Sequence, residues 1–504
     1  MNFTRILLIC ICICICIAFS GIASAKSLRI GITRVLDSRD PAKVTSFAGT
    51  LYMRLFTRTL TTANSDGSIT GDLAEKWSIS DDGRIYTITL KDGLHFSDGS
   101  PMTSRDVINS ISRHFWGSQS SYGSQLLREI ISGAANVREG TSIAGLKPLS
   151  DQHFQIKLAK SYPPILKVLS YSLWGIVKKS KHGRLVSLGD YDIKTISKDR
   201  IFLEKVGTGQ TSCGFDSFDF SLIGKGEGLS QGLLTKKLDV VIGKIPKSIP
   251  SHMVTSGLGG QGYIHLFYNN VKTIFTDAEL RADVNKSLSP IFDRITPAGL
   301  ISTRASKFLP PGALTISYSQ TRDTISELAT AEFRKKWHTK TRGKKLRLRL
   351  PPFFSKNDVA LLSRQIEAMG FTPDVTTHSF PELTQMFIKR DFDLAAQGYV
   401  GTIPDPDGYI NPLKRADFFP DRKSLDADLF DGLNKYRYTN TSLERLRGYE
   451  AVFNSFEKKA YFLPLFFARY PITLSKNIIA DTLFQYDPDL CQIIKASPQE
   501  QATK

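Results

Sequence analysis

The sequence predicts an α/β protein, because strand-like segments are interspersed with helical patterns along most of its length. The helical spacing of apolar residues is clear at Val359–Met369. The chain has 504 residues, more than a single hydrophobic core holds, so two or three domains are expected. The strand-like segments are Leu28–Ile32, Phe154–Leu158, Asp239–Ile242, Tyr263–Tyr268 and Leu346–Leu350.

The first 25 residues have the pattern of a secretory signal peptide. Arg5 precedes an apolar run from Ile6 to Phe19, and the small residues Ala23-Ser24-Ala25 follow. The run is shorter than the roughly 20 apolar residues that a membrane-spanning helix needs. We therefore expect cleavage before Lys26 and a soluble periplasmic protein.

The unit from Leu73 to Val107 is the most ordered pattern in the chain. A strand-like run, Arg84–Lys91, has apolar side chains at alternate positions and lies between two turn sequences rich in Asp, Gly and Pro. Thr103 then has the chemistry of a helix N-cap, and Asp106 lies near the positive end of the helix dipole. The unit predicts a half-buried strand followed by a helix.

Charge and cysteine content exclude several functional classes. The net charge is +18, and Arg334–Arg349 holds nine basic residues without an acid. Export excludes nucleic acid as a partner, so we interpret this stretch as a solvated loop followed by a strand, with contact to an anionic surface or attraction of an acidic ligand as the alternative. Only Cys213 and Cys491 lie outside the signal sequence, and the eight histidines are scattered, so neither a metal site nor a cofactor is expected.

The order of strand, turns and helix start in Leu73–Val107 resembles the signature of the extracytoplasmic solute-binding proteins, family 5, of peptide ABC transporters. Further matches follow in the family's order. They cover nearly the whole mature chain, although Gln210 stands where the family usually has proline. The matching segments are Val206–Gly209, Tyr268–Asn270, Phe275–Asp277, Leu280–Val284, Leu309–Gly312, Phe392–Leu394, Pro404–Asp407 and Tyr461–Phe466.

The resemblance implies a two-lobed periplasmic binding protein fold, type II of the peptide-binding class, with an additional small inserted domain. Lobe I would consist of residues 26–48, 160–262 and 468–504, the inserted domain of 49–159, and lobe II of 263–467. This layout would bring Cys213 and Cys491 into one lobe. A disulfide between them and two separate buried thiols are both open alternatives.

The resemblance also implies a function. A peptide or peptide-like solute would be captured between two closing lobes and delivered to an inner-membrane ABC permease, with no chemistry and as a monomer. A non-peptide solute, such as a nickel chelate, haem, a glycoside or a modified peptide, is the alternative within the family. A secreted serine hydrolase is the alternative from another class.

The ligand anchor is expected in the loop that follows the strand after Phe392. In peptide-binding relatives a carboxylate of this loop pairs with the ligand's α-ammonium. Thr402 occupies that position here, and Tyr399 stands where tryptophan is common. Either Asp405 or Asp407 takes over the pairing, or the ligand lacks a free α-amine. The resemblance suggests three further ligand contacts, Arg34, Tyr122 and Tyr486.

Two short motifs suggest other chemistry. Gly228–Gly232 fits G-x-S-x-G, with Ser230 as the nucleophile of the hydrolase alternative. Gly257, Gly259 and Gly262 fit G-x-G-x-x-G, but a strand-like segment follows instead of the helix that a phosphate-binding loop needs. We interpret these glycines as a flexible connector into the second lobe.

Overall fold

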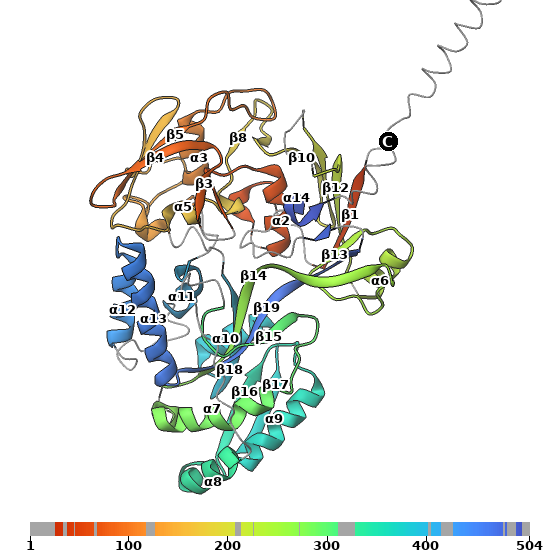
Figure 1. The fold of residues 1–504 in the computed structure, drawn as a ribbon, viewed down its shortest axis with the longest axis vertical. Helices are drawn as coiled ribbons and strands as arrows, with labels where there is room; N and C mark the ends of the chain where they lie inside the picture. The colour runs from red at the N-terminus through yellow and green to blue at the C-terminus, as the bar shows by residue number, and fades with distance from the viewer. Residues whose placement is uncertain are drawn as a thin grey trace, which may run out of the picture.

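A long mixed sheet runs through the molecule and joins its upper and lower parts (Figure 1). Its strand order is β10-β11-β12-β1-β13-β19-β14-β18-β16-β17, with β15 added at β19. Parallel and antiparallel pairs both occur, which agrees with the α/β class that the sequence predicts. This computed structural model describes residues 26–33, 38–44, 46–64, 68–116, 127–206, 213–224, 226–271, 273–310, 328–401, 405–414, 427–476, 479–480 and 490–495.

Lobe I holds one end of this sheet. The parallel pairs of β1 with β12 and with β13 form its centre, and α2 packs against it beside β10. Its strands are β1 (Ser27–Ile32), β10 (Tyr191–Ile196), β11 (Arg200–Lys205), β12 (Ser217–Leu222), β13 (Val240–Ile242), β20 (Ile479–Ala480) and β21 (Ile494–Lys495). Its helices are η1 (Pro41–Lys43), α2 (Phe47–Phe56), α6 (Gly226–Leu234) and α14 (Leu490–Ile493).

A small domain with its own antiparallel sheet, β4-β5-β7-β6, lies at the top of Figure 1. We define it by the core that residues between Leu60 and Val186 form. Its strands are β2 (Thr61–Ala63), β3 (Ile69–Gly71), β4 (Ala74–Ile79), β5 (Ile85–Leu90), β6 (Leu146–Pro148), β7 (His153–Lys157), β8 (Val177–Lys179) and β9 (Leu185–Ser187). Its helices are α3 (Ser104–Arg113), α5 (Ile165–Val168) and η2 (Ser172–Trp174).

Lobe II holds the other end of the long sheet, and two hydrophobic clusters cover the two faces of the sheet there. Helices α10 to α13 contribute to one cluster and α7 to α9 to the other. The strands are β15 (Ile301–Arg304), β16 (Lys345–Leu350), β17 (Thr372–Thr377) and β18 (Leu394–Val400). The helices are η3 (Ile274–Thr276), α7 (Ala278–Phe292), α8 (Leu328–Thr341), α9 (Lys356–Ala368), α10 (Phe380–Lys389), α11 (Asp407–Lys414), α12 (Ala427–Arg437) and α13 (Ser442–Lys458).

Two long antiparallel strands, β14 (Met253–Tyr268) and β19 (Phe462–Ser475), cross from one lobe to the other. Their lobe I halves pair from Met253 to Leu258, and their lobe II halves pair again from Gly262. The register shifts between these two stretches, where the chain reads Gly257-Leu-Gly-Gly-Gln-Gly262. The predicted connector is therefore part of β14, and the pairing of β14 with β19 is interrupted where the strand passes between the lobes.

The predicted unit at the start of the small domain is confirmed. In β5, Tyr86, Ile88 and Leu90 are buried and the residues between them are partly exposed. Thr103 is the N-cap of α3, and its amide and hydroxyl both donate to Asp106 Oδ2, at 2.8 and 2.9 Å. The helix at Val359–Met369 and the other predicted strands also coincide with observed elements to within a few residues, except that the strand predicted at Tyr263 begins ten residues earlier, at Met253.

The cores show where the small domain packs. Helix α2 contributes Leu51 and Phe56 to the lobe I core, whereas Tyr162 and Trp174 belong to the core of the small domain. Core membership thus favours limits near residues 57 and 187, compared with the predicted 49 and 159, and the exact division stays a proposal. None of the described helices is long and apolar enough to cross a membrane.

Candidate functional site

The predicted anchor loop leaves the long sheet at the end of β18 and leads into α11. Tyr399 is part of β18, half-buried against the cluster that α10 to α13 cover, and its ring lies 6.2 Å from that of Tyr263. This packing agrees with the core alternative for an aromatic side chain, and a ligand contact of Tyr399 stays a prediction. Thr402 lies outside the described residues, as do Arg34, Tyr122 and Tyr486, so their ligand contacts remain predictions.

Asp405 is paired with an arginine inside lobe II. Arg445 of α13 donates from Nη1 and Nη2 to the two carboxylate oxygens, at 2.6 and 2.7 Å, in a bidentate geometry. Both side chains are only 4% exposed. Asp405 Oδ1 also accepts the backbone N–H of Asp407 at 2.9 Å, so this carboxylate fixes the start of α11.

Asp407 is the centre of a second buried polar group. Its Oδ2 accepts hydrogen bonds from Arg437 Nε and from the hydroxyl of Tyr162, both at 2.9 Å, and its Oδ1 accepts one from the Tyr449 hydroxyl at 3.2 Å. The Asp407 side chain is fully buried, and that of Arg437 is 3% exposed. The residues come from α11, α12, α13 and the small domain.

The electrostatics of this group favour charged arginines and neutral tyrosines. Burial disfavours the charged form of Arg437, but the charge of Asp407 together with the neighbouring tyrosines outweighs burial and raises the pKa of Arg437. Burial and then the charge of Asp407 raise the pKa of the Tyr162 hydroxyl well above its ordinary value. Tyr162 therefore acts only as a neutral hydrogen-bond donor.

These contacts speak against the predicted role of Asp405 and Asp407 as partners of a ligand ammonium. Each carboxylate already has a guanidinium at hydrogen-bond distance and almost no exposure. Taking either carboxylate away would leave an arginine charge buried without its partner, which costs several kcal/mol. In this arrangement both aspartates hold the loop and its helix in place.

The sequence analysis missed Arg437, Arg445, Tyr162 and Tyr449 as members of this site. A signal was present in α13, where Arg445 shares one helical stripe with Tyr449, Val452 and Phe456. A basic residue in an otherwise apolar stripe is buried together with the stripe, and it then needs an acid. The loop with two aspartates is the natural source of that acid.

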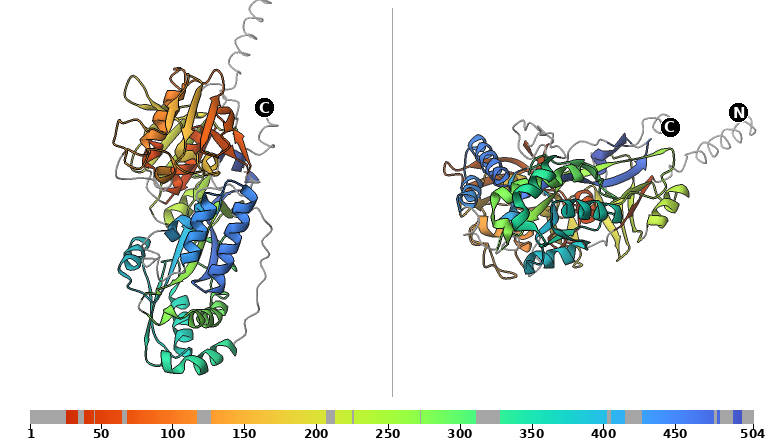
Figure 2. Two further views of the ribbon diagram at one scale, coloured as in Figure 1. Left: turned by 90° about the vertical axis from the view of Figure 1, so that its left-hand side faces the viewer. Right: turned by 90° about the horizontal axis from the view of Figure 1, so that it is seen from below.

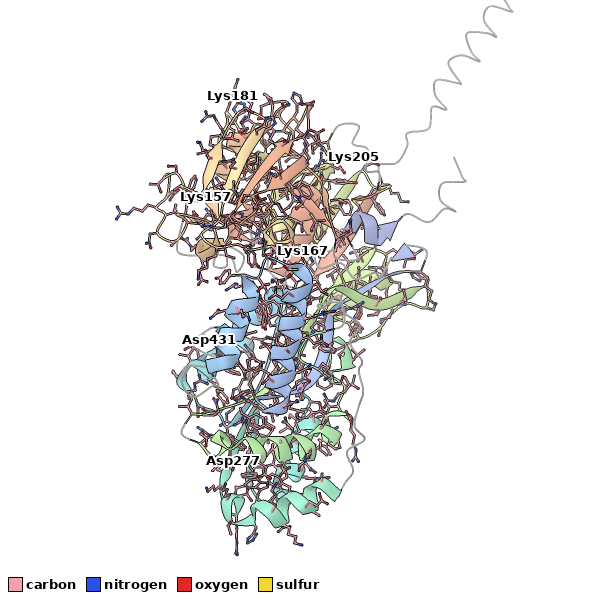
Figure 3. All side chains as sticks on the ribbon, turned by 60° about the vertical axis from the view of Figure 1, so that its left-hand side comes forward. Lys157, Lys167, Lys181, Lys205, Asp277 and Asp431 are labelled. Atoms are coloured by element: carbon pink, nitrogen blue, oxygen red, sulfur yellow. A yellow bond between two sulfur atoms is a disulfide. The ribbon has the colours of Figure 1, made fainter. Side chains whose placement is uncertain are left out.

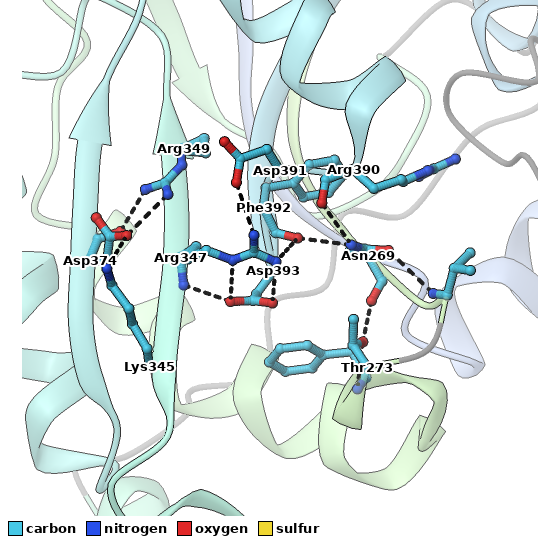
Figure 4. Close-up of polar contacts among 12 residues, drawn as sticks. Asn269, Thr273, Lys345, Arg347, Arg349, Asp374, Arg390, Asp391, Phe392 and Asp393 are labelled. Atoms are coloured by element: carbon cyan, nitrogen blue, oxygen red, sulfur yellow. Dashed lines mark hydrogen bonds and ion pairs between the residues drawn. The ribbon is translucent and has the colours of Figure 1, made fainter.

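Several basic side chains of Arg334–Arg349 form ion pairs with acidic residues of lobe II. We expected residues 334–341 to form a loop, but they are the end of α8. Phe333, Trp337 and Thr341 form a buried stripe on this helix, and the many charges between them hide that stripe in the sequence. The strand prediction is confirmed by β16. Figure 4 shows how its basic side chains are paired: Lys345 and Arg349 with Asp374, and Arg347 with Asp391 and Asp393.

Cys213 and Cys491 are joined in a disulfide, with a Cα–Cα distance of 4.7 Å. This is one of the two alternatives that the sequence left open. Cys213 belongs to the lobe I core, and Cys491 of α14 packs against it. The bond therefore ties the C-terminal segment to lobe I.

Neither short motif has the surroundings that its chemistry needs. Ser230 lies inside α6, not at a sharp turn between strand and helix, and its Oγ accepts the N–H of Ser248 at 3.1 Å. Gly257, Gly259 and Gly262 lie within β14, which leads into the second lobe, and no helix follows them; the predicted connector is thus part of a strand, and its flexibility stays a prediction. Among the described residues, no group of three or more His, Cys, Asp or Glu side chains is arranged to hold a metal ion.

Comparison with known proteins agrees with this architecture. Residues 68–419 match the family described as bacterial extracellular solute-binding proteins, family 5 middle. The dipeptide-binding protein of Lactococcus lactis is 35% identical over 117 residues, which is 22% of this chain and 20% of the relative. The periplasmic oligopeptide-binding protein OppA of Escherichia coli is 24% identical over 234 residues, 41% of this chain and 43% of the relative. These alignments thus span less than half the length of either relative.

Solved structures share the fold over nearly the full chain. The murein tripeptide-binding protein MppA of Escherichia coli has a TM-score of 0.70 at 18% identity, covering 94% of this chain and 99% of its own. A dipeptide-binding protein of Pseudoalteromonas in complex with Met-Leu has a TM-score of 0.72 at 16% identity, covering 93% and 100%. NikA of Brucella suis in complex with Fe(III)-EDTA has a TM-score of 0.74 at 14% identity, also covering 93% and 100%.

Proposed function

Because this chain belongs to the family 5 extracellular solute-binding proteins, we propose that it captures a peptide or peptide-like solute between its lobes and delivers it to an inner-membrane ABC permease. The observation that carries the proposal is the sheet that spans both lobes through β14 and β19. A glycine-rich interruption where two lobes join is suited to bending, and closure of the lobes would bury the solute and complete its contacts.

The residues of the anchor loop favour a ligand whose binding does not require an ion pair between its ammonium group and this loop. Thr402 replaces the expected acid, and Asp405 and Asp407 are both engaged with arginines. A hydroxyl can hydrogen-bond but cannot neutralise an ammonium. We therefore favour either a peptide held mainly through its backbone, which pairs like an added strand, or a solute without a free α-amine.

Native mass spectrometry of the protein purified from the source periplasm tests this proposal. A series of bound masses that fragment as peptides is the expected result. A single non-peptide mass would favour the alternative within the family, to which the structure of NikA with Fe(III)-EDTA gives some weight. The mass of the ligand-free species would also show whether the protein is a monomer, and whether the 25 residues before Lys26 have been removed.

The proposal includes no chemistry on the ligand. The position of Ser230 inside α6 supports this, because a serine nucleophile needs an exposed elbow. Treatment with a serine-reactive fluorophosphonate should leave the chain unlabelled. Labelling that disappears in Ser230→Ala would instead favour the hydrolase.

A further inference from the structure

The small domain and lobe II are in direct contact at a place separate from the strands that connect the lobes. The Tyr162 hydroxyl donates to Asp407 Oδ2 at 2.9 Å, and the Ser161 hydroxyl donates to Asn440 Oδ1 at 3.2 Å. Beside these bonds, Lys160 Nζ lies 4.9 Å from the ring centre of Tyr438, and Arg437 Nη1 lies 3.7 Å from Glu129 Oε2. We call these residues the docking contact.

The backbone of the small domain also meets lobe II closely. At Gly83, in the turn between β4 and β5, a Cβ would lie 2.6 Å from Asn440 Oδ1, so the backbone of this turn lies close to that side chain of lobe II. Figure 3 shows Lys167 of α5 at the junction between the small domain and the helices of lobe II. The left view of Figure 2 likewise shows the small domain above the helices α12 and α13.

The centre of the docking contact excludes water. Tyr162 and Asp407 are both fully buried, although one belongs to the core of the small domain and the other to lobe II. A rim surrounds them in which Glu129 is 69% exposed. Opening this contact would break the hydrogen bond between Tyr162 and Asp407 and expose the buried Tyr162 ring to water, so it is a poor candidate for repeated making and breaking.

The lobes are therefore held together at two separate places. One is the crossing of β14 and β19, where the register shifts between Leu258 and Gly262. The other is the docking contact, at the ends of α11 and α12. Two points that stay fixed during a rotation define its axis.

We propose that the docking contact persists while the lobes open and close, and that it sets the hinge axis together with the crossing strands. The small domain and the α11 to α13 side of lobe II then move little relative to each other. The far ends of lobe I and lobe II undergo the largest displacement. Without the contact, the crossing strands alone would also permit twisting of one lobe against the other.

Distances between paired spin labels test this inference without any ligand. The full mature chain, with its native disulfide, carries labels either at Asp81→Cys and Glu444→Cys, across the docking contact, or at Lys198→Cys and Lys335→Cys, on the two lobes. All four positions are exposed. We expect one narrow distance for the first pair and a broad distribution for the second.

The substitution Tyr162→Phe should broaden the first distribution, because it removes the hydroxyl and keeps the ring. Tyr268→Phe is the matched control: its buried hydroxyl donates to Asn285 Oδ1 at 2.6 Å within lobe II. If Tyr162→Phe does not fold by circular dichroism, Ser161→Ala with Asn440→Ala weakens the rim instead. A first pair as broad as the second in the unmodified chain would overturn the proposal. Equally narrow distance distributions for the two pairs would also overturn it. So would variants at the docking contact whose first distribution is as narrow as that of the control.

Discussion

At the scale of single residues, the pairing of Asp405 with Arg445 shows what a sequence conceals. The aspartate lies in a loop rich in Pro and Asp, which reads as exposed, and the arginine lies in a helix with many charges. The two residues are 40 positions apart in the sequence, so no local sequence pattern can predict their contact. The loop itself was identified by resemblance, but the direction in which its carboxylates point depends on α12 and α13.

We expect Arg445→Met to lower the free energy of unfolding by about 3–5 kcal/mol, because it leaves the Asp405 carboxylate buried without its partner. Urea denaturation followed by circular dichroism measures the change. Arg200→Met is the control, since its pair with Asp219 is at the surface and should contribute less than about 1 kcal/mol. A similar loss for both variants would mean that burial of the Asp405 pair has no special effect.

His265 should make the protein less stable in acid. Its ring is fully buried between Tyr263 and Phe462, and burial lowers its pKa from 6.5 to about 3. Between these two values the unfolded chain binds a proton that the folded chain does not, so stability falls as the pH falls from 6.5 towards 3. The slope due to this residue is at most about 1.4 kcal/mol per pH unit.

Urea midpoints at pH 7, 6, 5 and 4 check this prediction. His265→Phe keeps an aromatic ring in the stack, so the slope below pH 6.5 should become smaller even if the variant is less stable throughout. His114, which burial holds at a pKa of about 4, contributes a similar slope that the variant retains. Parallel curves for the two proteins would contradict the predicted pKa of His265.

Thr402 offers a test of the anchor loop. Thr402→Ala should weaken binding of the native solute by less than about 3 kcal/mol, the upper range for a hydrogen bond to a charged group. Isothermal titration with the solute recovered from the periplasm measures the difference. A larger loss would show that the loop is aligned incorrectly and that a charged anchor lies at this position.

At the scale of elements, local signals predicted β5 and α3 well and the crossing strands poorly. Alternation over Arg84–Lys91 and the N-cap at Thr103 are chemistry within a few residues. In contrast, β14 begins at Met253, ten residues before the predicted strand at Tyr263, because a segment with four glycines has little strand propensity of its own. Pairing with β19, some 200 residues later, keeps that segment extended.

Asp106→Ala should destabilise the small domain by about 1 kcal/mol, since its carboxylate accepts both the amide and the hydroxyl of Thr103 at the start of α3. Thermal unfolding of the full chain measures the loss. Thr103→Ser preserves both donors and serves as the control. An equal effect of the two substitutions would show that the capping bonds are not the cause.

At the scale of the whole molecule, the two-lobed architecture was predicted from the family resemblance, whereas the boundaries between the domains depend on packing. Composition gives no sign that α2 belongs with β10, because that contact joins residues more than 100 positions apart. The same holds for the disulfide. Two cysteines in a sequence fix neither their distance nor their lobe.

Replacing Cys213 and Cys491 together by serine should lower the free energy of unfolding by about 2–4 kcal/mol, because the bond restricts the unfolded chain between two distant residues. Urea denaturation of the oxidised protein and the double variant gives the difference. Thiol titration of the unfolded, unreduced protein provides the control. Two free thiols would show that the bond is absent in solution.

The lobe I sheet has a consequence for the order of assembly if the chain is exported as proposed. It contains β1 and is tied by the disulfide to α14, more than 450 residues later, whereas the described residues of lobe II all lie between Gly262 and Ala468. If the chain is exported from its N-terminus, as proposed, the small domain and then lobe II can complete their cores first. Lobe I would then wait until Cys491 arrives, and Cys213 would stay unpaired until that time. Its early strands would need protection from aggregation during this interval.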